Sequence, residues 1–105
     1  MGQARDHPFR DFVLDQLHDL PGLTCRSMFG GYGLYVQGVF FAILYDGRAY
    51  FRTDATSRAE YLTRGMEVFR PNDKQTLKNY YEVPAEILED AETLCAWARA
   101  ALRAR

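Results

Sequence analysis

The sequence has little of what marks several large classes of protein. Its 105 residues include two cysteines, Cys25 and Cys95, whose spacing fits no C-x-x-C metal or redox motif, so we expect two free, partly buried thiols. The longest apolar run, Val39–Tyr45, is far shorter than the roughly 20 residues that a membrane helix needs. Residues 1–7 also lack the apolar stretch of a secretory leader. We therefore expect a cytoplasmic protein without membrane partners.

An excess of charge of one sign is absent too. Thirteen lysines and arginines face 14 aspartates and glutamates, which gives a formal net charge of −1. No overall field therefore draws the protein to nucleic acid or to an anionic membrane. The sequence holds no internal repeat, no low-complexity tract and no linker rich in proline or serine. Since 48% of the residues are hydrophobic, we expect one folded domain over residues 1–105.

Three helices are predicted from apolar spacing and from end signals. Asp6 is the expected N-cap of the first helix, and Pro21 with Gly22 should end it. The second helix is expected over Asp54–Arg64, with Gly65 as its C-terminal stop. The third should follow Pro84, because a run of apolar residues there lies on one helical stripe: Leu88, Leu94, Trp97, Ala98, Ala101 and Leu102.

Five strands are predicted between these helices. Runs rich in aromatic and β-branched residues indicate strands at Ser27–Val36, Val39–Tyr45, Arg48–Thr53, Glu67–Arg70 and Leu77–Val83. Gln37-Gly38 and Asp46-Gly47 suit two-residue hairpin turns, and a polar turn is expected through Pro71, Asn72 and Asp73. The order is then helix, three strands, helix, two strands, helix. That order predicts an α+β fold, an antiparallel sheet with helices packed on it.

The strand over Val39–Tyr45 is apolar on both faces. It should therefore be a central strand that is covered twice. Regular alternation gives three side chains to each face: Val39, Phe41 and Ile43 on one, and Phe40, Ala42 and Leu44 on the other. A strand of this kind also leaves room for a homodimer interface through the sheet or a helix.

Met28–Tyr35 reads Met-Phe-Gly-Gly-Tyr-Gly-Leu-Tyr, and here the chain resembles the TfoX N-terminal domain, the first half of the TfoX/Sxy competence regulators. Further matches follow in family order: Arg26, Phe40–Ile43, Tyr50–Arg52, Tyr80–Pro84, Leu88–Asp90 and Trp97–Ala98. The resemblance implies a bacterial regulatory protein with a secretion-chaperone-like α+β fold, and folds of that kind are often paired. It supplies no catalytic residue. Because the full-length regulators carry a second, C-terminal domain, we expect a stand-alone N-terminal module, linked by resemblance to transcriptional regulation of competence.

The motif is also the best candidate for an interaction surface. Its predicted members are Arg26, Met28, Phe29, Gly30, Gly31, Tyr32, Gly33 and Tyr35, because aromatic side chains beside flexible backbone form docking patches. The glycines could instead cradle a phosphate. Their spacing matches neither G-x-G-x-x-G nor the P-loop, and a strand rather than a helix follows them. A bulge or tight bend that needs glycine is the structural alternative.

A nucleic-acid-binding face is the second hypothesis. Arg48, Tyr50 and Arg52 alternate along one predicted strand, and basic residues between aromatics can hold phosphates and stack bases. A solvated sheet face is the alternative for the same residues. Residues 25–81 carry eight basic and five acidic side chains, a weak excess, and no RNA-recognition signature is present. We therefore favour a protein partner of unknown identity over nucleic acid.

An enzyme or small-molecule-binding protein is the third hypothesis. His7 and His18 have no second metal ligand at helical spacing. Cys25 and His18 could pair as nucleophile and base, but the sequence indicates no third residue to orient them. We therefore expect no catalytic residue, no cofactor and no metal.

Overall fold

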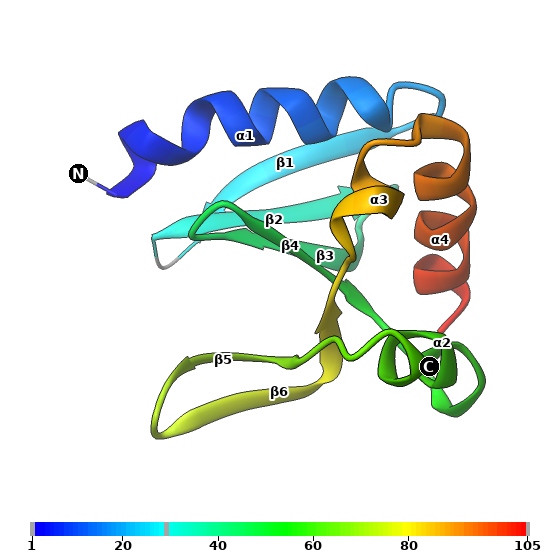
Figure 1. Cartoon of the computed structure of the whole chain (residues 1–105). Helices are drawn as coiled ribbons and strands as arrows, with labels where there is room; N and C mark the ends of the chain where they lie inside the picture. The colour runs from blue at the N-terminus through cyan, green and yellow to red at the C-terminus, as the bar shows by residue number, and fades with distance from the viewer. Residues whose placement is uncertain (1, 29, 105) are drawn as a thin grey trace.

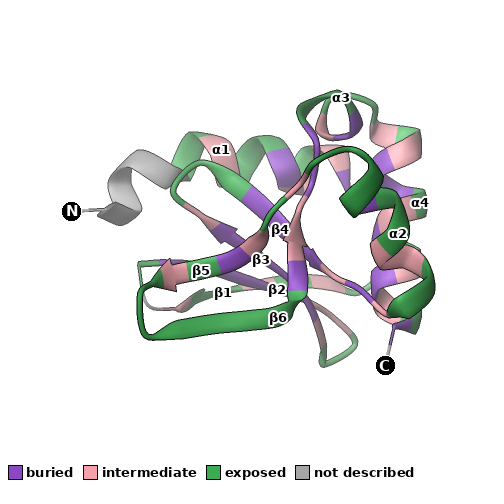
Figure 2. Ribbon diagram, turned by 60° about the horizontal axis from the view of Figure 1, so that its bottom comes forward, coloured by how far each residue is buried: buried purple, intermediate pink, exposed green. Residues whose placement is uncertain are grey.

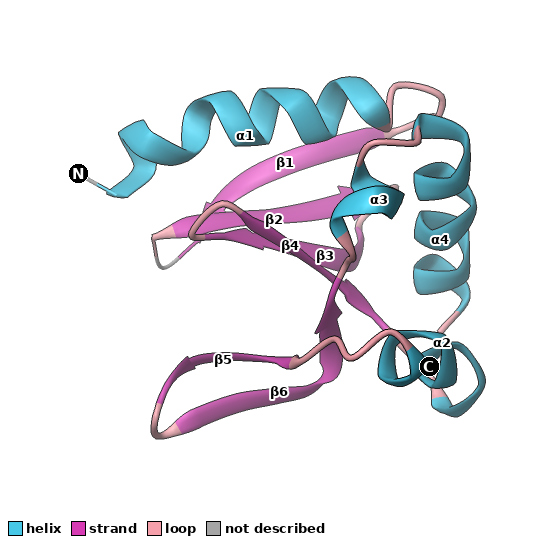
Figure 3. Cartoon of the chain, in the orientation of Figure 1, coloured by secondary structure: helices cyan, strands magenta, loops and turns pink. Residues whose placement is uncertain are grey.

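One antiparallel sheet of six strands organises the chain, in the order β1-β2-β3-β4-β6-β5. The computed structural model describes residues 2–28 and 30–104, with side chains from residue 7 onward. Along the chain the elements are α1 (Gly2–Gln16), β1 (Leu23–Met28), β2 (Gly31–Val36), β3 (Val39–Tyr45), β4 (Arg48–Arg52), α2 (Ala55–Thr63), β5 (Val68–Asn72), β6 (Gln75–Glu82), α3 (Ala85–Leu88) and α4 (Ala91–Arg103) (Figure 1, Figure 3). The expected α+β class is confirmed.

The glycine motif divides a stretch that the sequence presented as one strand. Four strands, not three, precede α2, because the predicted strand Ser27–Val36 is a hairpin of β1 and β2. Met28 pairs with Gly31 across the turn, and Gly30 has a φ of 83°. That left-handed conformation suits glycine and is typical of a tight turn. The expectation of a tight bend at this motif is confirmed at Gly30.

Two helices depart from their predicted bounds. α1 begins before Asp6, the expected N-cap, and ends at Gln16 rather than at Pro21, after which the chain forms turns as far as Gly22. The predicted last helix is two helices, α3 and α4. They are separate because the Asp90 side chain accepts a hydrogen bond from the backbone N–H of Thr93, at 3.2 Å, and so starts a new helix.

The two predicted hairpin turns and the predicted second helix are confirmed. Both residues of Gln37-Gly38 and of Asp46-Gly47 have positive φ, as a type I′ turn requires. The Asp54 side chain caps α2 by accepting a hydrogen bond from the Ser57 backbone N–H at 2.9 Å. The Asp54 backbone N–H in turn donates to the Ser57 hydroxyl oxygen. This reciprocal capping box fixes where the helix starts.

β5 and β6 form a hairpin arm that extends away from β1–β3 (Figure 1). Both strands are longer than predicted, and the turn lies at Asp73-Lys74 rather than through Pro71. Pro71 is inside β5, where it is tolerated because β5 is an edge strand. β6 also pairs with β4, so the arm remains part of the sheet.

Two hydrophobic clusters lie on opposite faces of the sheet. The main core combines residues of all four helices with one face, and it includes Val13, Tyr61, Ile87 and Leu94. The second cluster consists of strand residues alone: Ile43, Tyr50, Phe69 and Tyr80, with Phe40 and Tyr45 packed on it. We call its side of the sheet the helix-free face. The middle of β3 is buried (Figure 2), and its residues contribute to both clusters.

β3 is covered on both faces, as predicted, but the expected assignment of two side chains is wrong. Leu34 pairs with Ala42 while Tyr35, the next residue, pairs with Phe40. Phe41 is therefore the extra residue of a β-bulge. The bulge turns Phe41 toward the main core and Phe40 toward the helix-free face, the reverse of regular alternation.

Candidate interaction face

A row of side chains in contact crosses the helix-free face, with its rings tilted against one another. The Arg26 guanidinium lies 5.2 Å from the centre of the Tyr35 ring. The Tyr35 ring centre is 5.2 Å from that of Phe40, which is in turn 5.4 Å from that of Tyr80. We call Arg26, Tyr35, Phe40 and Tyr80 the aromatic row. It joins β1, β2, β3 and β6, so four strands hold its geometry.

Gly33 makes this packing possible. A Cβ atom on Gly33 would lie 2.7 Å from the Met28 sulfur, 3.0 Å from the Phe40 ring and 3.3 Å from the Tyr35 ring. Three side chains therefore converge over the space that glycine leaves open. Gly31 has a different neighbour, because its Cβ would meet the backbone carbonyl oxygen of Leu44.

A second set of rings lies where the arm meets the sheet. Phe69 of β5 packs against Tyr50 with ring centres 4.7 Å apart, and against Tyr45 at 5.5 Å. A groove of about 580 Å³ runs beside these rings, and Tyr45, Phe69 and Leu77 form part of its lining. The helix-free face therefore combines a row of rings with a groove along the arm.

The structure divides the predicted interaction surface between two faces. Arg26 is exposed, while Met28 and Tyr35 are half-buried on the helix-free face. Tyr32 does not belong to that surface. It is 3% exposed in the main core, with the Arg10 guanidinium 5.1 Å from its ring centre.

Of the remaining motif residues, Gly30 is exposed in the turn, Gly31 and Gly33 are buried, and Phe29 lies outside the described residues. Sequence reasoning missed Phe40 and Tyr80 as parts of the surface. The sequence contains the apolar run Val39–Tyr45 and the pair Tyr80-Tyr81. It gives no signal for the bulge that turns Phe40 toward the helix-free face.

Arg48, Tyr50 and Arg52 alternate along β4, and internal contacts occupy most of the set. Tyr50 is 8% exposed, and its burial raises the pKa of its hydroxyl. The Arg52 Nε and Nη2 donate to the carbonyls of Ala101 and Leu102 at 3.3 and 3.5 Å. Arg48 is exposed and lies 3.8 Å from Glu82. These positions present no open ring for stacking a base.

The whole of the second half of the chain, with most of the first, matches one family. The model of the TfoX N-terminal domain matches residues 15–105. The chain belongs to the TfoX N-terminal domain family. One curated relative is the DNA transformation protein TfoX1 of Aliivibrio fischeri (strain ATCC 700601 / ES114), which is 38% identical over 60 residues. That match covers 55% of this chain and 29% of the relative, so the similar part is less than a third of the relative's length.

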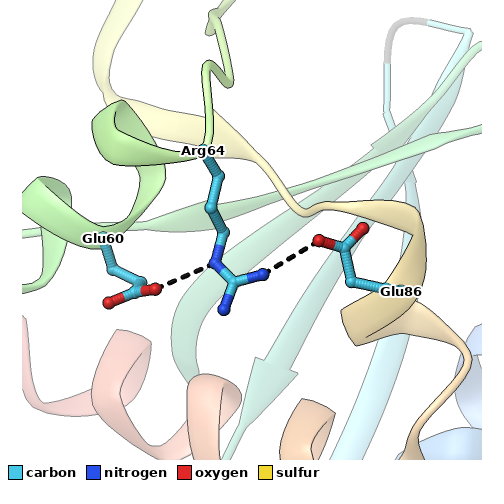
Figure 4. A network of polar contacts seen from close by, with 3 residues as sticks. All are labelled: Glu60, Arg64 and Glu86. Atoms are coloured by element: carbon cyan, nitrogen blue, oxygen red, sulfur yellow. Dashed lines mark hydrogen bonds and ion pairs between the residues drawn. The ribbon is translucent and has the colours of Figure 1, made fainter.

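Polar contacts in this TfoX N-terminal domain hold its helices together. Arg64 at the end of α2 lies 2.9 Å from Glu60 and 2.9 Å from Glu86 of α3 (Figure 4). Its guanidinium also lies 5.5 Å from the centre of the Trp97 ring of α4. The carboxylates raise the pKa of Arg64, so the guanidinium stays charged. This group therefore connects α2, α3 and α4.

The thiols of this TfoX domain have the character of structural cysteines. Cys25 and Cys95 are free, and burial raises the pKa of both, which keeps them protonated at neutral pH. His18 is exposed, with Nδ1 2.8 Å from the Asp15 carbonyl oxygen and Nε2 3.2 Å from Asp19.

Within the described part of the chain, no three His, Cys, Asp or Glu side chains gather as a metal site, and no helix is long and apolar enough to cross a membrane. The buried side-chain nitrogens and oxygens that the structure describes all have hydrogen-bond partners. The aromatic row and the groove beside the arm are therefore the features that call for a functional account.

Proposed function

We propose that this TfoX N-terminal domain is a non-enzymatic protein-interaction module that acts in transcriptional regulation of competence. The family match and the name of the relative, a DNA transformation protein, support the biological setting. The observation that carries the proposal is the aromatic row, whose Tyr35 and Phe40 remain half-exposed although their side chains are in contact. The contact with a protein partner would form there.

The composition of the row favours a protein partner. Aromatic residues, methionine and arginine are enriched at protein interfaces. Met28, Tyr35 and Arg26 lie on this face, and the contact of the Arg26 guanidinium with the Tyr35 ring restricts both side chains before any partner binds. Little side-chain entropy would then be lost on binding. The net charge of −1 gives nucleic acid no comparable advantage.

The test is capture of partners from the domain's own host with matched variants. Tyr35→Ala removes the centre of the row, while Phe12→Ala removes an aromatic of 41% exposure from α1, away from the row. We expect wild type and Phe12→Ala to retain the same protein after nuclease treatment, and Tyr35→Ala to lose it. Transformation frequency of the host should fall with Tyr35→Ala alone.

Two results would contradict the proposal. If nuclease removes all captured material, the nucleic-acid hypothesis takes precedence, and a double Arg48→Ala/Arg52→Ala variant should then weaken binding in a salt-dependent way. If Tyr35→Ala and Phe12→Ala behave alike, the aromatic row is not the contact surface.

A further inference from the structure

The two edges of the sheet differ in how they resist pairing with another strand. β5 forms one edge and contains Pro71, with register irregularities at Val68/Phe69 and Phe69/Asn72. Proline and bulges are devices that protect an edge. β1 forms the other edge and pairs with β2 in continuous register over all six of its residues, without a proline. β1 is therefore the edge that remains suited to pairing.

The register identifies the backbone groups that are available on β1. Next to the first residue of the strand, the Gln37 N–H donates to the Gly22 carbonyl at 3.4 Å. Hydrogen-bonded pairs alternate along an antiparallel ladder, so Thr24, Arg26 and Met28 are the β1 residues that bond to β2. The N–H and C=O groups of Leu23, Cys25 and Ser27 therefore point away from β2. No strand that the structure describes pairs with them.

We propose that β1 pairs antiparallel with β1 of a second copy of this chain, about a two-fold axis at Cys25. The outward backbone groups of Cys25 then bond to those of Cys25 in the second copy, and those of Leu23 bond to those of Ser27. Two six-stranded sheets become one continuous sheet. This proposal concerns the sheet edge and does not rest on the proposed partner of the aromatic row, with which it shares Arg26.

Length and charge select this register. With the axis at Cys25, the whole stretch 22–28 is paired, and Arg26 lies opposite Thr24 of the second copy. An axis at Arg26 would place the two arginines directly opposite each other, which is destabilising. An axis at Thr24 would leave residues 27 and 28 opposite 21 and 20, which precede the strand.

The partial burial of the β1 side chains is consistent with pairing to a second copy. Leu23 and Cys25 pack on the main core but are only half-buried. In the proposed pairing, Cys25 meets Cys25 and Leu23 meets Ser27 of the second copy. The open sides of these apolar groups are then removed from water.

Charge at residue 24 provides the first test, by sedimentation equilibrium of the purified chain. Thr24 is exposed, and its side chain shares a face with Arg26. Thr24→Glu should tighten the dimer and Thr24→Arg should weaken it, each by roughly two- to thirtyfold, because each dimer contains the pair twice. Thr56→Glu and Thr56→Arg, at an exposed position of α2, should leave association unchanged.

Oxidative cross-linking tests the register. Cys95→Ser leaves Cys25 as the sole cysteine, and the Cα atoms of a hydrogen-bonded pair are about 5.5 Å apart, within disulfide range. We expect a disulfide-linked dimer. A Cys25→Ser/Cys95→Ser/Thr24→Cys variant should not cross-link, because its Cα atoms would be about 8 Å apart. Thermal unfolding of each variant reports whether it is folded.

Three outcomes would overturn the proposal. A wild-type chain that stays monomeric at every concentration lacks the interface. If the dissociation constant of the dimer does not change with the charge at residue 24, the dimer uses another surface. Cross-linking through residue 24 instead of residue 25 places the axis elsewhere.

Discussion

At the scale of single residues, two glycines of the motif are required for different reasons. Gly31 lies under the backbone carbonyl of Leu44, in the neighbouring part of β3. Gly33 lies under the movable end of Met28 and the edges of two rings. A backbone atom in a paired strand cannot shift without breaking the ladder, whereas a methionine side chain can change rotamer. The two positions should therefore differ in tolerance.

The prediction is that Gly31→Ala destabilises the domain more than Gly33→Ala. For Gly33→Ala we expect a loss of about 1–3 kcal/mol, the usual effect of an added methyl group in a packed site. Gly31→Ala should exceed that loss because β3 itself must move. Urea unfolding of both variants measures the difference. Equal free energies of unfolding for the two variants would contradict this prediction, because they would show that the β3 backbone moves as easily as the Met28 side chain.

At the scale of elements, helix ends depend on short-range hydrogen bonds. The contribution of the α2 N-cap to stability should depend on pH, because the group that accepts its hydrogen bond is the Asp54 carboxylate. The hydrogen bond from the Ser57 backbone N–H is the largest cause that lowers the pKa of Asp54. A lowered pKa in the folded state means that the cap stabilises the fold above the unfolded pKa, near 3.8, and that this stability is lost as the pH falls through the folded pKa.

Asp54→Asn keeps a capping acceptor but removes the titration. We expect the difference in urea midpoint between wild type and Asp54→Asn to be larger at pH 7 than at pH 2.5. Asp54→Ala should lower the midpoint at both pH values, since it removes the cap itself. A wild-type advantage that persists unchanged at pH 2.5 would contradict the assigned role of the carboxylate.

The elements that could be predicted from the sequence are those with local signals. Asp46-Gly47 predicts its turn from two residues, and the helix predicted to begin at Asp54 does begin there, although the cap made by the Asp54 side chain was not predicted. The split between β1 and β2 was missed because Gly30 and its aromatic neighbours fit a strand equally well. Nothing local distinguishes the bulge at Phe41, which arises from pairing with β2. The aromatic row depends on that bulge, so its members Phe40 and Tyr80 could not be assigned from the sequence.

At the scale of the whole molecule, the sheet is stabilised by two clusters of unequal kind. The main core joins every helix to one face, so its loss should affect all elements together. The second cluster joins the arm to β3 and β4 through Phe69, which is 1% exposed. Beyond the pairing of Tyr80–Glu82 with β4, the arm is a two-stranded hairpin, and such hairpins are marginal alone. Its order therefore depends on Phe69.

The last prediction is that Phe69→Ala releases the arm without unfolding the rest of the domain. Truncating a buried phenylalanine typically costs about 3–5 kcal/mol, and at this position the loss falls on the contact between β5 and the sheet. Hydrogen exchange should then speed up in β5 and the outer part of β6, while β1–β3 keep their protection. Phe51→Ala, in the main core, should reduce protection in every strand.

Leu77→Ala is the matched control, because Leu77 is in the arm but 38% exposed. It should leave exchange nearly unchanged. If Phe69→Ala instead lowers protection equally in β1 and in β5, the two clusters form one cooperative unit and the arm cannot open by itself. If the arm alone is released, the groove beside Tyr45 can widen while the fold of the family is retained, because one of its walls is then the least stable part of the sheet.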